Sequence, residues 1–78
     1  MVHELKIKGE YLLAIQEGRK TFEIRKLDRD FKENDYLYLR EFHDGKYTGN
    51  ECVKKISYIY VGNDEYGLKK GFGILGII

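Results

Sequence analysis

Three charged residues, Lys20, Glu23 and Arg25, stand close together in the segment Gly18–Arg25, which reads Gly-Arg-Lys-Thr-Phe-Glu-Ile-Arg. A guanidinium offers a planar fork of donors, an ammonium is a compact positive charge, and a carboxylate accepts hydrogen bonds from an exocyclic amine or a ribose hydroxyl. If these groups converge, they suit an anion or a nucleobase. The same spacing is also typical of a solvated strand face with a Glu23–Arg25 surface pair, which contributes little to stability. Spacing alone slightly favours the surface pair.

A local excess of positive charge surrounds these residues. The chain has a net charge of only +1, but the window from Arg19 to Lys32 holds six basic and three acidic residues. This excess suits an anionic ligand, although a mixed-charge surface loop gives the same count. Within the window, Asp28-Arg29-Asp30 is typical of an ordered loop in which the carboxylates cap loop amides and pair with Arg29. A binding role for Arg29 is the minority interpretation.

Tyrosines form the second group that could contact a ligand. Aromatic rings beside Arg or Lys stack single-stranded bases in many binding modules. Aromatic residues are also favoured in strands, so packing is the preferred explanation for most of them. The six tyrosines of the predicted strands and loops are Tyr36, Tyr38, Tyr47, Tyr58, Tyr60 and Tyr66.

Metal and nucleophile chemistry find no support in the pattern. His3 and His43 are far apart and Cys52 is the single cysteine, so no zinc-ligand spacing exists and no internal disulfide can form. We expect no cofactor, a packed Cys52, and a His3 that is structural or exposed. No His and acid surround Ser57 in the pattern of a serine nucleophile.

Alternation and breaker residues predict the elements that must position the charged group. Leu5 and Ile7 alternate with polar residues, and Gly18 stands where a left-handed residue ends a helix. In the strand after the helix, Phe22 and Ile24 are expected to face the core. The predicted order is a strand His3–Ile7, a helix Glu10–Glu17, a strand Thr21–Lys26, an ordered loop Leu27–Asp35 anchored by Phe31, a strand Tyr36–Phe42, a strand from Tyr47 to Val61, a connection Gly62–Lys70 and a buried strand Phe72–Ile78.

Length and composition predict one small domain spanning residues 1–78. With 42% hydrophobic and 35% charged residues, the chain is typical of a compact domain of mostly β (α+β) class with one short helix. No apolar run approaches the ~20 residues that span a bilayer, and no secretory leader pattern opens the chain. We therefore expect a cytoplasmic location without a membrane partner. The sequence does not indicate an oligomeric state.

The segment Gly18–Arg25 also resembles the G-x-K-x-x-E-x-R motif of ASCH domains, relatives of the PUA domain. All four fixed positions are present. Further segments resemble a short, functionally uncharacterised branch of that family in bacteria and phages, with Asn34 where the branch commonly has glycine. These segments are His3-Glu4-Leu5-Lys6, Asp28-Arg29-Asp30-Phe31, Tyr47-Thr48-Gly49, Gly67-Leu68 and Leu75-Gly76-Ile77.

The resemblance implies a small PUA-like β-barrel with a cleft beside the motif, proposed to bind RNA. It favours an RNA- or nucleotide-binding module that uses Lys20, Glu23 and Arg25, helped by Arg29 and Tyr47. One alternative is a small amidohydrolase acting on a modified nucleobase, with Lys20 and Glu23 as base and acid. ASCH-type enzymes that act on acetylated cytidine use a threonine where this chain has Glu23, which argues against that reaction. A protein-interaction domain is the third possibility.

Overall fold

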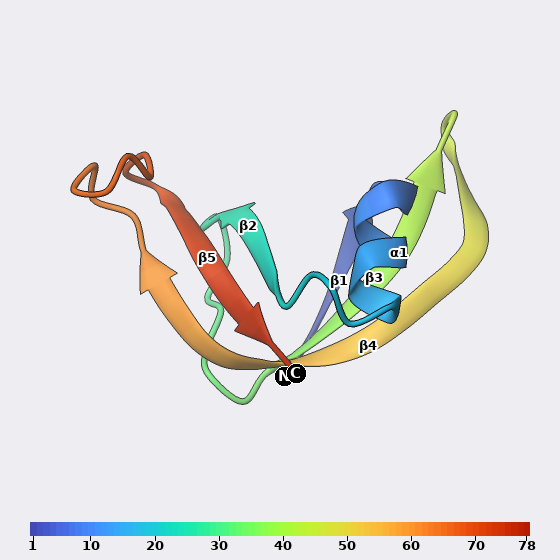
Figure 1. The fold of residues 1–78 in the computed structure, drawn as a ribbon, viewed down its shortest axis with the longest axis horizontal. Coiled ribbons are helices and arrows are strands. Elements are labelled where there is room, and N and C mark those ends of the chain that lie inside the picture. Colours follow the sequence, from blue (N-terminus) through green and yellow to red (C-terminus); the bar gives the residue numbers. More distant parts are fainter.

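The computed structural model describes all residues 1–78 and has five strands and one helix (Figure 1). The single helix has eight residues, and none of the chain's helical structure is long and apolar enough to cross a bilayer. The strands and the helix occur in the order that the sequence pattern predicts. The elements are β1 (Val2–Ile7), α1 (Gly9–Gln16), β2 (Phe22–Lys26), β3 (Tyr36–His43), β4 (Lys46–Val61) and β5 (Phe72–Ile77).

The strands form one strongly bent sheet in the order β1-β3-β4-β5-β2. β1 pairs in parallel with β3, and the other neighbours are antiparallel. The 16-residue β4 belongs to both halves of the sheet, because its first part pairs with β3 and its last part pairs with β5. Figure 1 shows the result as a V, with β1, β3 and α1 on one arm, β5 and β2 on the other, and both termini at the vertex.

The expected closed barrel is wrong, because the two outer strands of the sheet do not pair with each other. β1 pairs only with β3 and β2 pairs only with β5, which leaves two free strand edges facing across the mouth of the V. Side-chain hydrogen bonds cross this mouth, whereas a closed barrel would have backbone hydrogen bonds between the two strands there. Arg25 Nη2, for example, donates to the Lys6 carbonyl at 2.9 Å.

The core lies inside the bend, where alternate strand residues and one helix face meet. Leu37 and Leu39 of β3 are fully buried, and Phe31 anchors the loop before β3 as predicted. Leu12 and Ile15 place α1 against this core, which is consistent with their helical spacing. The ten buried hydrophobic residues are Leu5, Ile7, Leu12, Ile15, Phe31, Leu37, Leu39, Ile56, Leu75 and Ile77.

The face of β2 that points inward is the opposite of the predicted one. Phe22 and Ile24 are 41% and 53% exposed, whereas Glu23 is only 4% exposed. The register with β5 explains the reversal, because Glu23 lies opposite the fully buried Leu75 and directly opposed residues share a sheet face. Alternation identified two faces in β2, but its partner strand determined which one became the inner face.

The turn at the end of α1 places the segment Gly18–Arg25 at the mouth of the V. Gly18 has φ +80°, the left-handed conformation expected of it. The Gly18 N–H donates to the Ile15 carbonyl and the Arg19 N–H to the Ala14 carbonyl, which is the hydrogen-bond pattern of a Schellman motif. The Lys20 N–H also donates to Ala14. This turn fixes the backbone that carries Lys20 before β2 begins.

Candidate ligand-binding cleft

The free edges of β1 and β2 form the walls of the candidate site. Hydrogen bonds alternate in direction along each strand, so every second residue of an edge strand points its backbone groups away from its partner. On β1 the outward carbonyls include those of Glu4 and Lys6, and on β2 they include that of Phe22. All three accept hydrogen bonds from side chains, donated by Arg29, Arg25 and Lys20 respectively. Basic side chains therefore bond to three of the outward carbonyls, two on β1 and one on β2.

Glu23 joins two of these basic side chains at the floor of the cleft. Lys20 Nζ donates to its Oε1, and Arg25 Nε donates to its Oε2 at 2.9 Å. Lys20 also donates to the Phe22 carbonyl at 2.6 Å and lies 4.8 Å from the centre of the Phe22 ring. The side chains of Lys20 and Arg25 are 16% and 22% exposed, so both reach the cleft surface while Glu23 stays beneath them. The predicted trio is thus brought together, with Glu23 as the buried counter-ion.

The first pocket is a hollow of about 480 Å³ over this ion-pair group. Four cationic side chains line it against one carboxylate, and the Tyr11 and Phe22 rings supply apolar wall. Lys20 lies 5.2 Å and Lys8 5.8 Å from the centre of the Tyr11 ring. The lining residues are Lys6, Ile7, Lys8, Tyr11, Lys20, Phe22, Glu23, Ile24 and Arg25.

The second pocket, of about 320 Å³, adjoins the first and shares Lys6 and Arg25 with it. It holds both remaining predicted site residues, Arg29 and Tyr47. All five residues predicted from the sequence therefore lie on two adjoining pockets. The lining residues are Glu4, Leu5, Lys6, Arg25, Lys26, Asp28, Arg29, Phe31 and Tyr47.

Lys6, Lys8 and Tyr11 line the first pocket but were not among the predicted site residues. The outward position of Lys6 is visible in the alternation of β1, and Lys8, directly after the strand, continues it. That these positions face β2 across the cleft depends on the bend of the sheet, which no local pattern encodes.

Four of the six tyrosines are exposed and lie outside the core, although two of them still pack against another ring, Tyr47 against Phe42 and Tyr66 against Tyr60. Tyr36, Tyr47, Tyr58 and Tyr66 are exposed, and of these only Tyr47 lines a pocket. Tyr47 is 39% exposed, and the Arg40 guanidinium carbon lies 3.8 Å from the centre of its ring.

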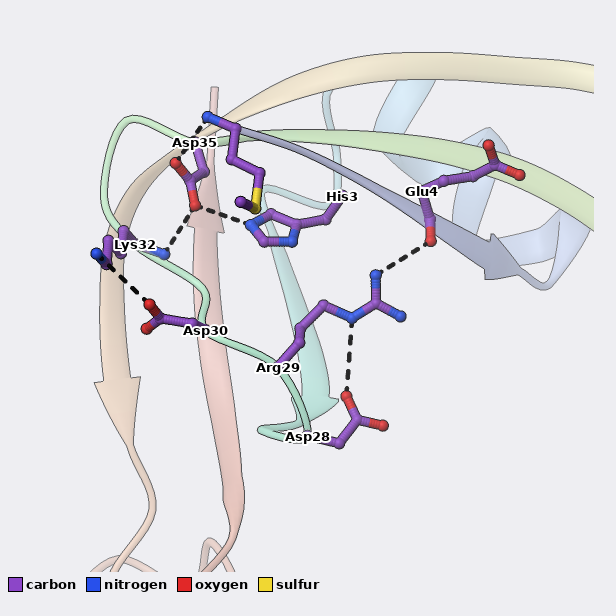
Figure 2. A network of polar contacts seen from close by, with 8 residues as sticks. His3, Glu4, Asp28, Arg29, Asp30, Lys32 and Asp35 are labelled. Carbon is purple, nitrogen blue, oxygen red and sulfur yellow. Dashed lines mark hydrogen bonds and ion pairs between the residues drawn. The ribbon is translucent and has the colours of Figure 1, made fainter.

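The loop before β3 is organised by Asp35 rather than by Asp28 and Asp30 (Figure 2). Asp35 accepts a hydrogen bond from the Lys32 amide at 3.1 Å, whereas Asp30 makes only a 3.5 Å ion pair with the Lys32 ammonium. The prediction that Asp28 and Asp30 cap loop amides is therefore wrong. Arg29 does face Asp28, at 3.8 Å, but it also reaches across the cleft to the Glu4 carbonyl at 3.4 Å.

His3 is buried beside Asp35, away from the two pockets. Its Nε2 lies 2.8 Å from Asp35 Oδ2, and its ring centre lies 4.7 Å from that of Phe31. The amino group of Met1 lies 3.1 Å from Asp35 Oδ1 (Figure 2). These contacts tie the start of β1 to the loop that leads into β3, so His3 has the structural role that was one of its two expected roles.

The Asp35 contacts predict a loss of stability in acid. The hydrogen bond with His3, followed by those from the Met1 amine and the Lys32 amide, lowers the Asp35 pKa from 3.8 to about 2, although desolvation opposes the shift. A carboxyl with a depressed folded-state pKa stabilises the fold above its unfolded pKa and loses that contribution as the pH falls through the folded value. The free energy of unfolding should therefore decrease between about pH 4 and pH 2.

Urea unfolding at pH 7, 4 and 2.5 tests this expectation. Asp35→Asn should lower stability at pH 7 and flatten the acid-dependent loss, whereas the exposed Asp30→Asn should behave like the wild type. An unchanged pH dependence in Asp35→Asn would show that another carboxyl is responsible.

The geometry defines a class of protein: a small, bent, open β-sheet domain with one helix and a basic, aromatic-lined cleft between its edge strands. The chain belongs to the family described as "Domain of unknown function (DUF3850)", which matches residues 2–77. It is also 36% identical over 56 residues to the "Uncharacterized 12.9 kDa protein in GpA 3'region" of Escherichia phage P2.

The alignment with the phage protein covers 72% of this chain and 51% of the phage protein, so the chain spans about half the length of that relative. A relative in a phage was expected, and this comparison provides one. Neither comparison connects the chain to ASCH or PUA domains, and that wider relation stays a prediction.

Proposed function

We propose that the first pocket binds RNA or a nucleotide. The observation that carries this proposal is the gathering of four cations and two aromatic rings around one hollow of about 480 Å³, a size within the range of roughly 300–1,000 Å³ typical of ligand pockets. The cations would pair with phosphate, and the rings of Tyr11 and Phe22 would stack a base. The predicted resemblance of Gly18–Arg25 to the ASCH motif supports the same ligand class by analogy.

Glu23 acts in this proposal as a positioning residue. One carboxylate oxygen pairs with Lys20 and the other pairs with Arg25. Both donors are therefore already oriented when a ligand binds. Preorganised donors bind more tightly than flexible ones because less conformational entropy is lost on binding. This assignment differs from a direct contact between Glu23 and an exocyclic amine.

Binding is a better fit to the site than the two alternatives. An acid–base pair would need both groups to contact substrate, but the Glu23 side chain is only 5% exposed beneath Lys20 and Arg25. A protein-interaction surface would be flat and apolar, whereas this site is concave and basic. Incubating the protein with acylated nucleosides and analysing them by mass spectrometry tests the hydrolase alternative directly.

Lys20→Ala is expected to weaken binding of single-stranded RNA by about tenfold, because one charge-assisted contact is lost. Fluorescence titration of a labelled oligoribonucleotide at two salt concentrations measures the effect, and affinity should fall as salt rises. Arg19→Ala is the matched control, since Arg19 is next in the chain but pairs only with Glu17 and lines neither pocket. Absence of binding by the wild type would refute the proposal.

A further inference from the structure

Resting on the proposed function, we infer that the second pocket is a second nucleotide subsite, so that the ligand is a single-stranded oligonucleotide crossing Arg25 rather than a free nucleotide. The two pockets are continuous in their lining, because Lys6 and Arg25 belong to both. The bond from Arg25 Nη2 to the Lys6 carbonyl forms the divide between them. A chain occupying both pockets would pass directly over this pair.

Two donor groups at this divide, Lys6 Nζ and Arg25 Nη1, have no hydrogen-bond partner in the chain. Lys6 Nζ makes no hydrogen bond or ion pair within the chain and lies 4.1 Å from the centre of the Phe42 ring. Arg25 uses Nε and Nη2 for Glu23 and Lys6, which leaves its Nη1 without a partner in the chain. These free donors at the junction suit the phosphate that links two nucleotides.

The second pocket also combines cations with aromatic rings, although two carboxylates, those of Glu4 and Asp28, line it beside four cations. Lys26 lines it without any hydrogen bond or ion pair in the chain, and Arg29 lies at its rim with a weak 3.8 Å pairing to Asp28. Tyr47 supplies an exposed aromatic ring. Cations beside a ring are the combination that holds single-stranded nucleic acid without reading its sequence.

The edges of the cleft argue against an extended peptide as the occupant. A peptide that adds a strand to a sheet needs free backbone acceptors on the edge. Here the carbonyls of Glu4, Lys6 and Phe22 already accept side-chain hydrogen bonds. An anionic chain that contacts side chains instead of backbone is compatible with this arrangement.

Calorimetric titration with the four nucleoside 5′-monophosphates and the matching homodinucleotides, each with a 5′-phosphate, tests the inference. At least one dinucleotide should bind about tenfold more tightly than its mononucleotide, since a second base and the linking phosphate are engaged. Lys26→Ala and Tyr47→Leu should each remove a large part of that gain while leaving mononucleotide affinity unchanged. Lys70→Ala, an exposed lysine outside both pockets, should change neither.

The outcomes separate this inference from the proposed function. Equal affinity for mono- and dinucleotides, or a gain that survives both second-pocket variants, would overturn the second subsite and leave nucleotide binding standing. Binding of neither ligand would overturn the proposed function and the subsite with it. A hexaglutamate peptide that binds as tightly as the dinucleotide would identify the groove as a site for acidic peptides and overturn the inference.

Discussion

Glu23→Gln is expected to weaken oligonucleotide binding by about tenfold and to lower the free energy of unfolding by about 1–3 kcal/mol. The amide removes the negative charge that lies between Lys20 and Arg25 and places an NH₂ group against one of the two cations. The side chains of Lys20 and Arg25 are partly exposed, so water would offset some of the lost pairing. The cleft would keep its shape but lose the counter-ion that orients its donors.

Urea unfolding and ligand titration measure the two effects on the same sample. The matched control is Glu33→Gln, which removes one charge from an exposed residue that lines neither pocket. If Glu23→Gln binds the oligonucleotide as tightly as the wild type, then the orientation of Lys20 and Arg25 by Glu23 does not contribute to affinity.

Arg25→Lys is expected to cost about as much binding affinity as Glu23→Gln, although the charge is retained. Arg25 contacts Glu23 through Nε and the Lys6 carbonyl through Nη2, and one ammonium on a flexible stem cannot reproduce that fork. The bridge between β1 and β2 would be lost, and stability should fall by about 1 kcal/mol for the missing hydrogen bond. Backbone amides of β2 should then exchange with solvent faster.

Hydrogen exchange followed by mass spectrometry monitors the strand, and Arg19→Lys provides the control at an exposed position. Unchanged exchange in Phe22–Lys26 together with full binding would mean that the Arg25 bridge neither holds the cleft edges nor contributes to the ligand site.

Much of the fold could be predicted because local patterns encode it. Alternation located the strands, and Leu37 and Leu39 do face the core while Tyr36 faces outward. The helix stop at Gly18 followed from the conformational freedom of glycine. The open mouth of the sheet could not be predicted, since closure depends on how β4 bends between β3 and β5.

The inward face of β2 shows where local patterns fail. Phe22 and Ile24 are the apolar choice for a core, yet they lie outside because β5 presents Leu75 inward opposite Glu23. A buried carboxylate is tolerated only when it is paired, and Lys20 and Arg25 supply the pairing. The buried carboxylate of the candidate cleft is thus the residue that breaks the hydrophobic pattern.

The candidate residues lie close together although the barrel expected around them does not form. The charge excess and the motif resemblance identified Lys20, Glu23 and Arg25, and the structure places all three on one pocket. Lys6, Lys8 and Tyr11 were not predicted to line the cleft because they come from β1, from the residue after it and from α1, and only the tertiary fold sets them opposite β2.

The most direct test of nucleic-acid binding in this cleft is an amide chemical-shift map of the ¹⁵N-labelled protein during titration with a single-stranded oligoribonucleotide. We predict saturable shifts at Lys6, at Lys20, at Phe22–Lys26, at Arg29 and at Tyr47, which line the two pockets. Shifts confined to the outer face of β4 and β5, at Tyr58, Tyr60 and Ile74, or no shifts at all, would contradict the account.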